Sequence, residues 1–304
     1  MVNFDSASLN RIWSAMIVPM DNHEAISFET LDRLVEAQIA DGVEGFYCCG
    51  SSGEGLLLTL EERKQVLERV LKQVNGRVPV ISHVGTIRTA DAADLAQHAM
   101  SAGALAVSMI PPYYYKFSTD EIQGYYEDVM TAVPEAPVII YNIPQFTGVE
   151  FNKGNAWRLL SNDHIVGIKH TSQNLYSLER MHEAFPSKIL INGFDEQFLG
   201  ALSMGATATI GTTVNLFAPL FLKLRDAFLA GDQEGALRLQ HAINMRVEET
   251  VRIGIFNAMK YGWTLRGIDC GFCRSPFRPL SLPAQKAMEH LMAQPVEGFL
   301  RTTL

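Results

Sequence analysis

Lys169 is the residue of this 304-residue chain whose setting most clearly indicates chemistry. It follows residues 165–168 (Ile-Val-Gly-Ile), an apolar run typical of a buried strand, where an unpaired ammonium would be costly. Loss of water favours the neutral amine, which can attack a ketone and form an imine. The sequence therefore indicates Schiff-base catalysis at Lys169. A lysine that reaches solvent or forms an ion pair at the strand end is the alternative.

Ser51 and Ser52 lie in a Gly-Ser-Ser-Gly-Glu segment, residues 50–54, that could bind an anion. Small residues let backbone N–H groups approach a carboxylate, and the two hydroxyls add donors. The segment matches neither the dinucleotide fingerprint nor the P-loop. A small carboxylate is therefore the expected ligand, and an ordinary turn rich in glycine and serine is the alternative.

Tyr141 and the pair Asp195 and Glu196 complete the candidate polar groups. A tyrosine at the end of an apolar run could carry a proton to and from a substrate oxygen, although many such residues are packed aromatics. Neighbouring carboxylates on a loop diverge in direction. The acidic pair therefore favours recognition of a hydroxylated substrate, or a helix N-cap, over paired acid–base catalysis.

Histidine and cysteine spacing predicts no metal site and no cofactor. Neither His83 nor His170 has a second ligand at a suitable spacing. Cys270 and Cys273 form a C-x-x-C pattern late in the chain, outside the strand-to-helix setting of a redox motif, and the adjacent Cys48 and Cys49 would be awkward zinc ligands. We expect four reduced thiols, with redox or zinc binding as the weaker interpretation.

Eight short apolar runs alternate with amphipathic segments, which is the pattern of βα units on a parallel sheet. The expected strands are 14–18, 45–49, 78–84, 104–110, 137–141, 166–170, 189–192 and 206–210, with helices such as 27–40, 59–74 and 118–132 between them. This alternation predicts an α/β fold, a (β/α)8 TIM barrel over residues 1–230. Residues 216–261 and 283–292 are expected to be helical, so 231–304 forms a C-terminal helical extension within one structural unit.

Active sites of such barrels lie at the C-terminal ends of the strands. The polar residues expected there are Ser51, Ser52, Tyr114, Tyr141, Lys169, Asp195, Glu196 and Thr212. The barrel would therefore gather all of the candidate groups at one end.

Charge and hydropathy exclude several classes of partner. The formal net charge is −8 and no run of Lys or Arg is present, so we expect no nucleic-acid and no membrane partner. The N-terminus lacks the features of a secretory signal, and no apolar stretch approaches the length of a membrane span. We expect a cytoplasmic protein.

Six motifs together resemble the N-acetylneuraminate lyase and dihydrodipicolinate synthase family, from about Ile12 to Met292, and most closely its lyase branch. The motifs are residues 50–54, 141–144 with 147–148, 167–172 with 174–176, 192–196, 211–213 and 273–277. The resemblance implies that Lys169 forms the imine with C2 of a 2-oxo acid and that Tyr141 is the proton shuttle. Tyr141 would work with the Ser52 hydroxyl and with Tyr114 of an adjacent subunit.

The resemblance also implies the ligands and the assembly. The implied substrate-binding residues are Ser51, Ser52, Thr171, Gly193, Asp195, Glu196, Gly211, Thr212 and Phe256. They would bind a sugar acid, with pyruvate as one product, in a homotetramer made of two dimers.

Phe146 separates the branches of the family, whereas Ser52 and Thr212 are departures from the family pattern that keep the hydroxyl. Phe146 stands where dihydrodipicolinate synthases usually have an arginine, Ser52 where the family commonly has threonine, and Thr212 where the lyases often have serine. Phe146 in place of the arginine and the Asp195–Glu196 pair together favour reversible cleavage of N-acetylneuraminate to N-acetylmannosamine and pyruvate. A 2-keto-3-deoxygluconate-type aldolase is the alternative, followed by a dihydrodipicolinate synthase-like enzyme or a non-catalytic barrel that binds an oxo acid.

Overall fold

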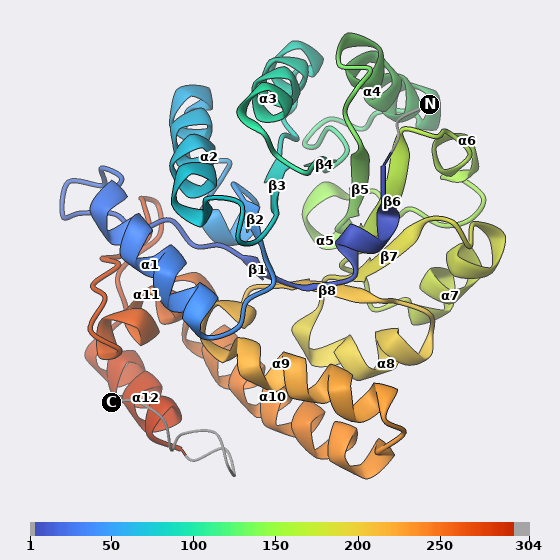
Figure 1. Ribbon diagram of the computed structural model, residues 1–304. Coiled ribbons are helices and arrows are strands. Elements are labelled where there is room, and N and C mark those ends of the chain that lie inside the picture. The colour runs from blue at the N-terminus through green and yellow to red at the C-terminus, as the bar shows by residue number, and fades with distance from the viewer. Residues whose placement is uncertain (1–3, 295–304) are drawn as a thin grey trace.

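The computed structural model describes residues 4–294 and contains eight parallel strands closed into a barrel (Figure 1). Each strand pairs with the next one in sequence, and β8 closes the ring against β1. The strands are β1 (Ile12–Ala15), β2 (Gly45–Cys48), β3 (Val80–His83), β4 (Ala106–Met109), β5 (Val138–Asn142), β6 (Ile165–His170), β7 (Ile189–Asn192) and β8 (Ala208–Gly211). The predicted (β/α)8 barrel is confirmed.

Helices surround the barrel and continue beyond the last strand (Figure 1). The α-helices are α1 (Phe28–Ala40), α2 (Leu60–Val74), α3 (Thr89–Ala102), α4 (Thr119–Ala132), α5 (Pro144–Thr147), α6 (Trp157–Leu160), α7 (Leu175–Ala184), α8 (Phe198–Ser203), α9 (Val214–Leu229), α10 (Gln233–Ile253), α11 (Ile255–Leu265) and α12 (Leu282–Ala293). Three short 3-10 helices are η1 (Ser6–Leu9), η2 (Ser51–Gly53) and η3 (Asp195–Gln197). Thr59 and Ser118 each form a capping box, so α2 and α4 begin where the sequence predicts.

The first strand differs most from its predicted range, since the ladder covers residues 12–15 rather than 14–18. Met16, Ile17 and Val18 are as buried as the strand itself, and Met16 N–H still donates to Tyr47 O at 3.0 Å. An apolar run that is buried on both faces does not mark the residue at which ladder pairing stops.

Alternation along the strands divides the core into two layers. In β5, Ile139 and Tyr141 belong to the cluster inside the barrel, whereas Val138 and Ile140 pack in the layer between strands and helices. Lys169 is the register partner of Tyr141 on the adjacent strand. It therefore faces the barrel interior, as Tyr141 does.

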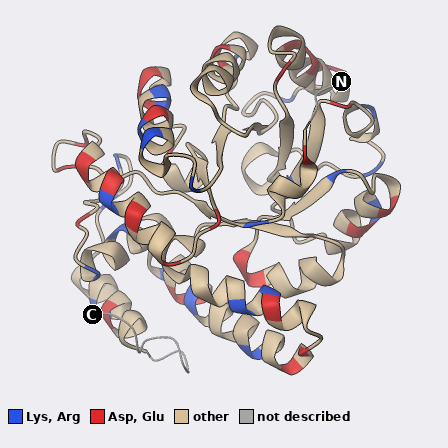
Figure 2. Cartoon of the chain, viewed as in Figure 1, with Lys and Arg blue, Asp and Glu red and all other residues tan. Residues whose placement is uncertain are grey.

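The C-terminal helices α10, α11 and α12 pack on one another, and α10 also lies along α9 (Figure 1). The predicted boundary at residue 230 falls between α9 and α10, while residues 295–304 of the expected extension lie outside the described residues. Acidic and basic residues are interspersed over the outer helices (Figure 2). Within residues 4–294, no helix is both long and apolar enough to cross a membrane.

Candidate active site

A cavity of about 270 Å³ lies at the C-terminal ends of the strands. The predicted site residues that line it are Ser51, Ser52, Tyr141, Lys169, Thr171, Gly193, Asp195, Glu196, Thr212 and Phe256. A larger hollow of about 530 Å³ lies between α10 and α12, and Glu249 and His290 are the only titratable residues among those described that line it. The first cavity, and not the larger one, holds the lysine, the hydroxyls and the acidic pair.

Lys169 is almost fully buried, with 4% of its surface exposed, although it lines the cavity. Its Nζ lies 3.9 Å from the centroid of the Tyr141 ring and 4.6 Å from that of Tyr47. Across residues 4–294, no carboxylate lies within ion-pair distance of this nitrogen. The two alternatives left open by the sequence, a solvent-exposed lysine and an ion-paired one, therefore do not describe Lys169.

Tyr47 is a site residue that the sequence analysis missed. It is buried in β2, its hydroxyl lies 3.1 Å from Ser108 Oγ, and its ring meets Tyr141 edge to face at 6.1 Å. Gly50 leaves room for this ring, since a Cβ there would lie 2.4 Å from it. The one signal in the sequence was its place four residues before Ser51, within the predicted strand 45–49.

The Ser51–Ser52 turn is a single 3-10 turn, η2, at the end of β2. Ser52 Oγ and Thr212 Oγ1 are 2.7 Å apart, so a hydroxyl pair links the loops after β2 and β8. Gly53 follows directly, and a Cβ there would lie 2.7 Å from the backbone oxygen of Met16. The motif therefore needs a glycine at 53 because the turn packs against the chain that leaves β1.

Thr171 and Gly193 lie together at the ends of β6 and β7. Thr171 Oγ1 is buried and has no hydrogen-bond partner among the described residues. A Cβ on Gly193 would lie 1.8 Å from this hydroxyl oxygen. Glycine at 193 thus leaves room for the Thr171 side chain, and both residues line the cavity.

Asp195 joins the loops after β7 and β8. Its Oδ2 accepts hydrogen bonds from the backbone N–H and the hydroxyl of Thr213, both at 2.7 Å, while Oδ1 has no partner in the described part of the chain. Burial raises the pKa of Asp195 to about 6, against the opposing effect of the Thr213 hydrogen bonds. Burial also raises the pKa of the neighbouring Glu196. Asp195 thus bonds to Thr213, the residue just before α9, and does not cap its own helix.

Gly211 and Tyr114 do not line the cavity. A Cβ on Gly211 would lie 1.8 Å from Asp195 Oδ1, so Gly211 makes room for that carboxylate. Tyr114 is 85% exposed, adopts a φ of 78° and stacks edge to face on Tyr115 at 5.1 Å. Within this subunit, Tyr114 is therefore separate from the other predicted catalytic residues.

Cysteine chemistry is absent from the cavity. Cys48, Cys49, Cys270 and Cys273 are all buried free thiols, and burial raises the pKa of each one. Within residues 4–294, no group of three or more His, Cys, Asp and Glu side chains is arranged to hold a metal ion.

Comparison with known proteins finds relatives that are N-acetylneuraminate lyases. The chain is 39% identical over 295 residues to the N-acetylneuraminate lyase of Rhizobium meliloti, covering 97% of this chain and 98% of that protein. It is 34% identical to the N-acetylneuraminate lyase of Lactiplantibacillus plantarum, with coverages of 87% and 91%. These identities extend over whole chains and not over isolated motifs.

Solved structures agree with the sequence relatives. CdNal from Clostridium difficile, in complex with mannosamine, superposes with a TM-score of 0.91 at 30% identity, covering 93% of this chain and 97% of that one. A catalytic lysine mutant of Ruminococcus gnavus sialic acid aldolase also gives a TM-score of 0.91, at 29% identity and coverages of 95% and 96%. The model of the dihydrodipicolinate synthetase family matches residues 8–295. That match spans nearly all of the described chain and confirms the resemblance carried by the motifs: the chain belongs to the dihydrodipicolinate synthetase family.

Proposed function

We propose that this protein is a class I aldolase that reversibly cleaves N-acetylneuraminate to N-acetylmannosamine and pyruvate through a Schiff base on Lys169. The observation that carries the proposal is the buried amine of Lys169, which lines the cavity with no carboxylate partner among the described residues. The relatives named above, which include a sialic acid aldolase with a catalytic lysine, support the same chemistry.

Lys169 performs the covalent step. Its neutral amine adds to the C2 ketone of the substrate, and loss of water leaves a protonated imine. As the C3–C4 bond breaks, the bonding electrons pass into the imine to give an enamine, and the C4 hydroxyl becomes the aldehyde of the sugar product. Protonation at C3 and hydrolysis of the imine then release pyruvate and restore the amine.

Tyr141 and the Ser51–Ser52 turn handle the proton and the carboxylate. Tyr141, whose ring packs against Lys169 Nζ, takes the proton from the C4 hydroxyl during cleavage and returns it in the reverse direction. Ser51 and Ser52 hold the substrate carboxylate through their hydroxyls and the backbone N–H groups of the turn. The carboxylate is thereby placed beside both the imine and Tyr141.

The lining of the cavity suits a long hydroxylated substrate. Thr171, Asp195 and Glu196 line the cavity and provide its polar wall, which would meet the substrate hydroxyls. The apolar lining residues are Ile143, Phe146, Val247, Val251, Ile255 and Phe256. Among the described lining residues Lys169 is the single cation, so a second carboxylate would find no partner, which disfavours a dihydrodipicolinate synthase-like substrate.

The exposed Tyr114 supports a proposal about assembly. An aromatic side chain that is 85% exposed, on a backbone with positive φ, is a costly arrangement for an isolated subunit. We infer that Tyr114 enters the active site of a neighbouring subunit and that the enzyme is a homotetramer made of two such dimers.

Borohydride trapping and substrate profiling test the proposed function. Reduction in the presence of pyruvate should leave a pyruvate-derived adduct on the peptide that contains Lys169, and Lys169→Ala should abolish both the adduct and turnover. N-acetylneuraminate should be cleaved faster than 2-keto-3-deoxygluconate in a coupled pyruvate assay. Faster cleavage of the shorter acid would move the assignment to the alternative aldolase, and an unmodified Lys169 would contradict an enzymatic role.

A further inference from the structure

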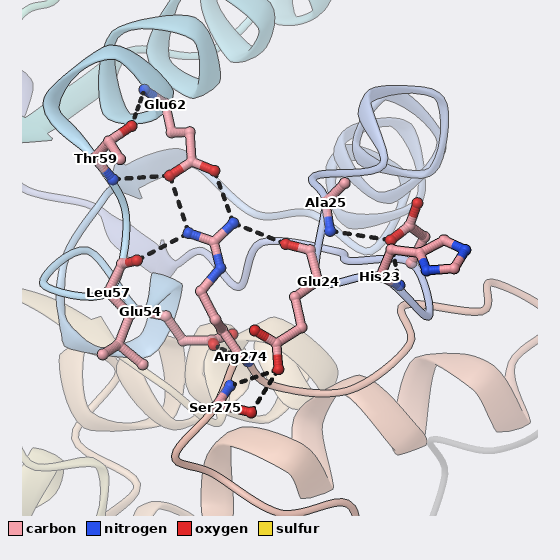
Figure 3. A network of polar contacts seen from close by, with 10 residues as sticks. His23, Glu24, Ala25, Glu54, Leu57, Thr59, Glu62, Arg274 and Ser275 are labelled. Atoms are coloured by element: carbon pink, nitrogen blue, oxygen red, sulfur yellow. Dashed lines mark hydrogen bonds and ion pairs between the residues drawn. The ribbon is translucent and has the colours of Figure 1, made fainter.

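Arg274 lies at the centre of a polar network between the loop that follows α11 and the loops that follow β1 and β2 (Figure 3). Its guanidinium donates to both carboxylate oxygens of Glu62, at 2.9 and 2.7 Å. The same group donates to the backbone oxygens of Leu57 and Glu24, each at 2.8 Å. Ser275 adds two hydrogen bonds to the Glu24 carboxylate. One side chain thus joins three segments that are far apart in sequence.

Glu54 extends the network to the substrate-binding turn. Its side chain is fully buried, its Oε1 lies 2.7 Å from Lys260 Nζ, and its Oε2 accepts the backbone N–H of Arg274 at 2.6 Å. Glu54 is also the residue that ends η2, with a left-handed φ of 56°, and its N–H donates to Ser51 O at 3.1 Å. A displacement of the Glu54 carboxylate would therefore move the backbone of the turn itself.

Lys260 connects the turn to α11, which contributes apolar residues to the cavity. It lies in α11, whose first residues Ile255 and Phe256 line the cavity, and its side chain is 1% exposed. Besides the ion pair, Lys260 Nζ donates to Phe272 O at 2.9 Å. The Lys260 ammonium thus links the residue that follows the Ser51–Ser52 turn to α11, two of whose residues line the cavity.

We propose that Glu54, Lys260 and Arg274 are positioning residues, which hold the Ser51–Ser52 turn where the carboxylate of a 2-oxo acid imine on Lys169 must lie. The inference rests on the proposed function. A buried ion pair contributes little net stability, because the cost of removing both charges from water offsets their attraction. Its contribution here is geometry: the ion pair and the hydrogen bond to Arg274 N–H give the turn a single position.

The test separates binding of pyruvate from binding of the sugar aldehyde. The double variant Glu54→Gln with Lys260→Met removes both charges together and leaves no unpaired buried ion. In the synthesis direction, KM for pyruvate should rise about tenfold or more, while KM for N-acetylmannosamine should stay within about twofold. The pyruvate concentration that half-saturates borohydride trapping of Lys169 should rise in parallel. Arg274→Lys, which keeps the charge but loses the paired bonds to Glu62, should give a smaller rise of the same kind.

Glu44→Gln is the matched control. Glu44 lies just before β2, whereas Glu54 lies after it. Glu44 is ion-paired with Arg225 at 2.6 Å, at the end of the barrel opposite the cavity. This variant should lower the melting temperature without changing KM for pyruvate. The inference would be overturned if KM for pyruvate were unchanged in the folded double variant and in Arg274→Lys. It would also be overturned if KM rose equally for both substrates. Neither result would contradict the proposed function. Absence of a pyruvate adduct in the wild-type protein would instead overturn the proposed function.

Discussion

Asp195 uses its two carboxylate oxygens in different ways. One carboxylate oxygen is saturated by the N–H and hydroxyl of Thr213, and the other has no partner in the described chain. A buried acceptor without a partner costs free energy in the empty protein.

The pKa of Asp195 gives a measurable pH dependence of stability. Burial raises the pKa from 3.8 to about 6, so the folded protein binds the proton more tightly than the unfolded chain, and stability falls as the pH rises through this window. Between pH 5 and pH 8 the loss should be about 1.4 kcal/mol. Asp195→Asn cannot titrate, so the stability of this variant relative to the wild type should increase by that amount from pH 5 to pH 8. Urea unfolding of both proteins at the two pH values measures it, and a constant difference would contradict the assignment.

At the scale of elements, the η2 turn depends on close backbone approach at Gly53. Gly53→Ala places a methyl group 2.7 Å from Met16 O, so the turn must shift. The shift should cost about 1 to 3 kcal/mol of stability and raise KM for pyruvate several-fold. Gly124→Ala is the control, because Gly124 lies in α4 with no atom within 4 Å of the added methyl. That change should stabilise the protein by up to about 1 kcal/mol with unchanged kinetics. Wild-type pyruvate binding in Gly53→Ala would argue against a tightly packed turn.

The eight strands were predictable because short runs of apolar residues mark buried strands. The polar residues at the ends of the strands follow directly after these runs. Lys169 and Tyr141 each follow an apolar run, and a barrel brings the ends of all such runs together. Tyr47 was not predictable in the same way, because strands that are apolar on both faces do not reveal which residues face inward. The bond from Asp195 to Thr213 and the ion pair from Glu54 to Lys260 join loops and helices distant in sequence, and no local pattern encodes them.

At the scale of the whole molecule, the position of Tyr114 makes a prediction about how subunits share a site. If Tyr114 acts across an interface, a subunit with Lys169→Ala still supplies Tyr114 to its neighbour, and a subunit with Tyr114→Phe still supplies Lys169. Each variant alone should be strongly impaired, but a mixed dimer should contain one complete site. Random mixing by co-expression should therefore restore about a quarter of wild-type activity, because half of the dimers are mixed and each has one of its two sites complete. Light scattering on the same sample gives the subunit number, and a mixture no more active than its separate components would mean that Tyr114 does not complete a neighbouring site.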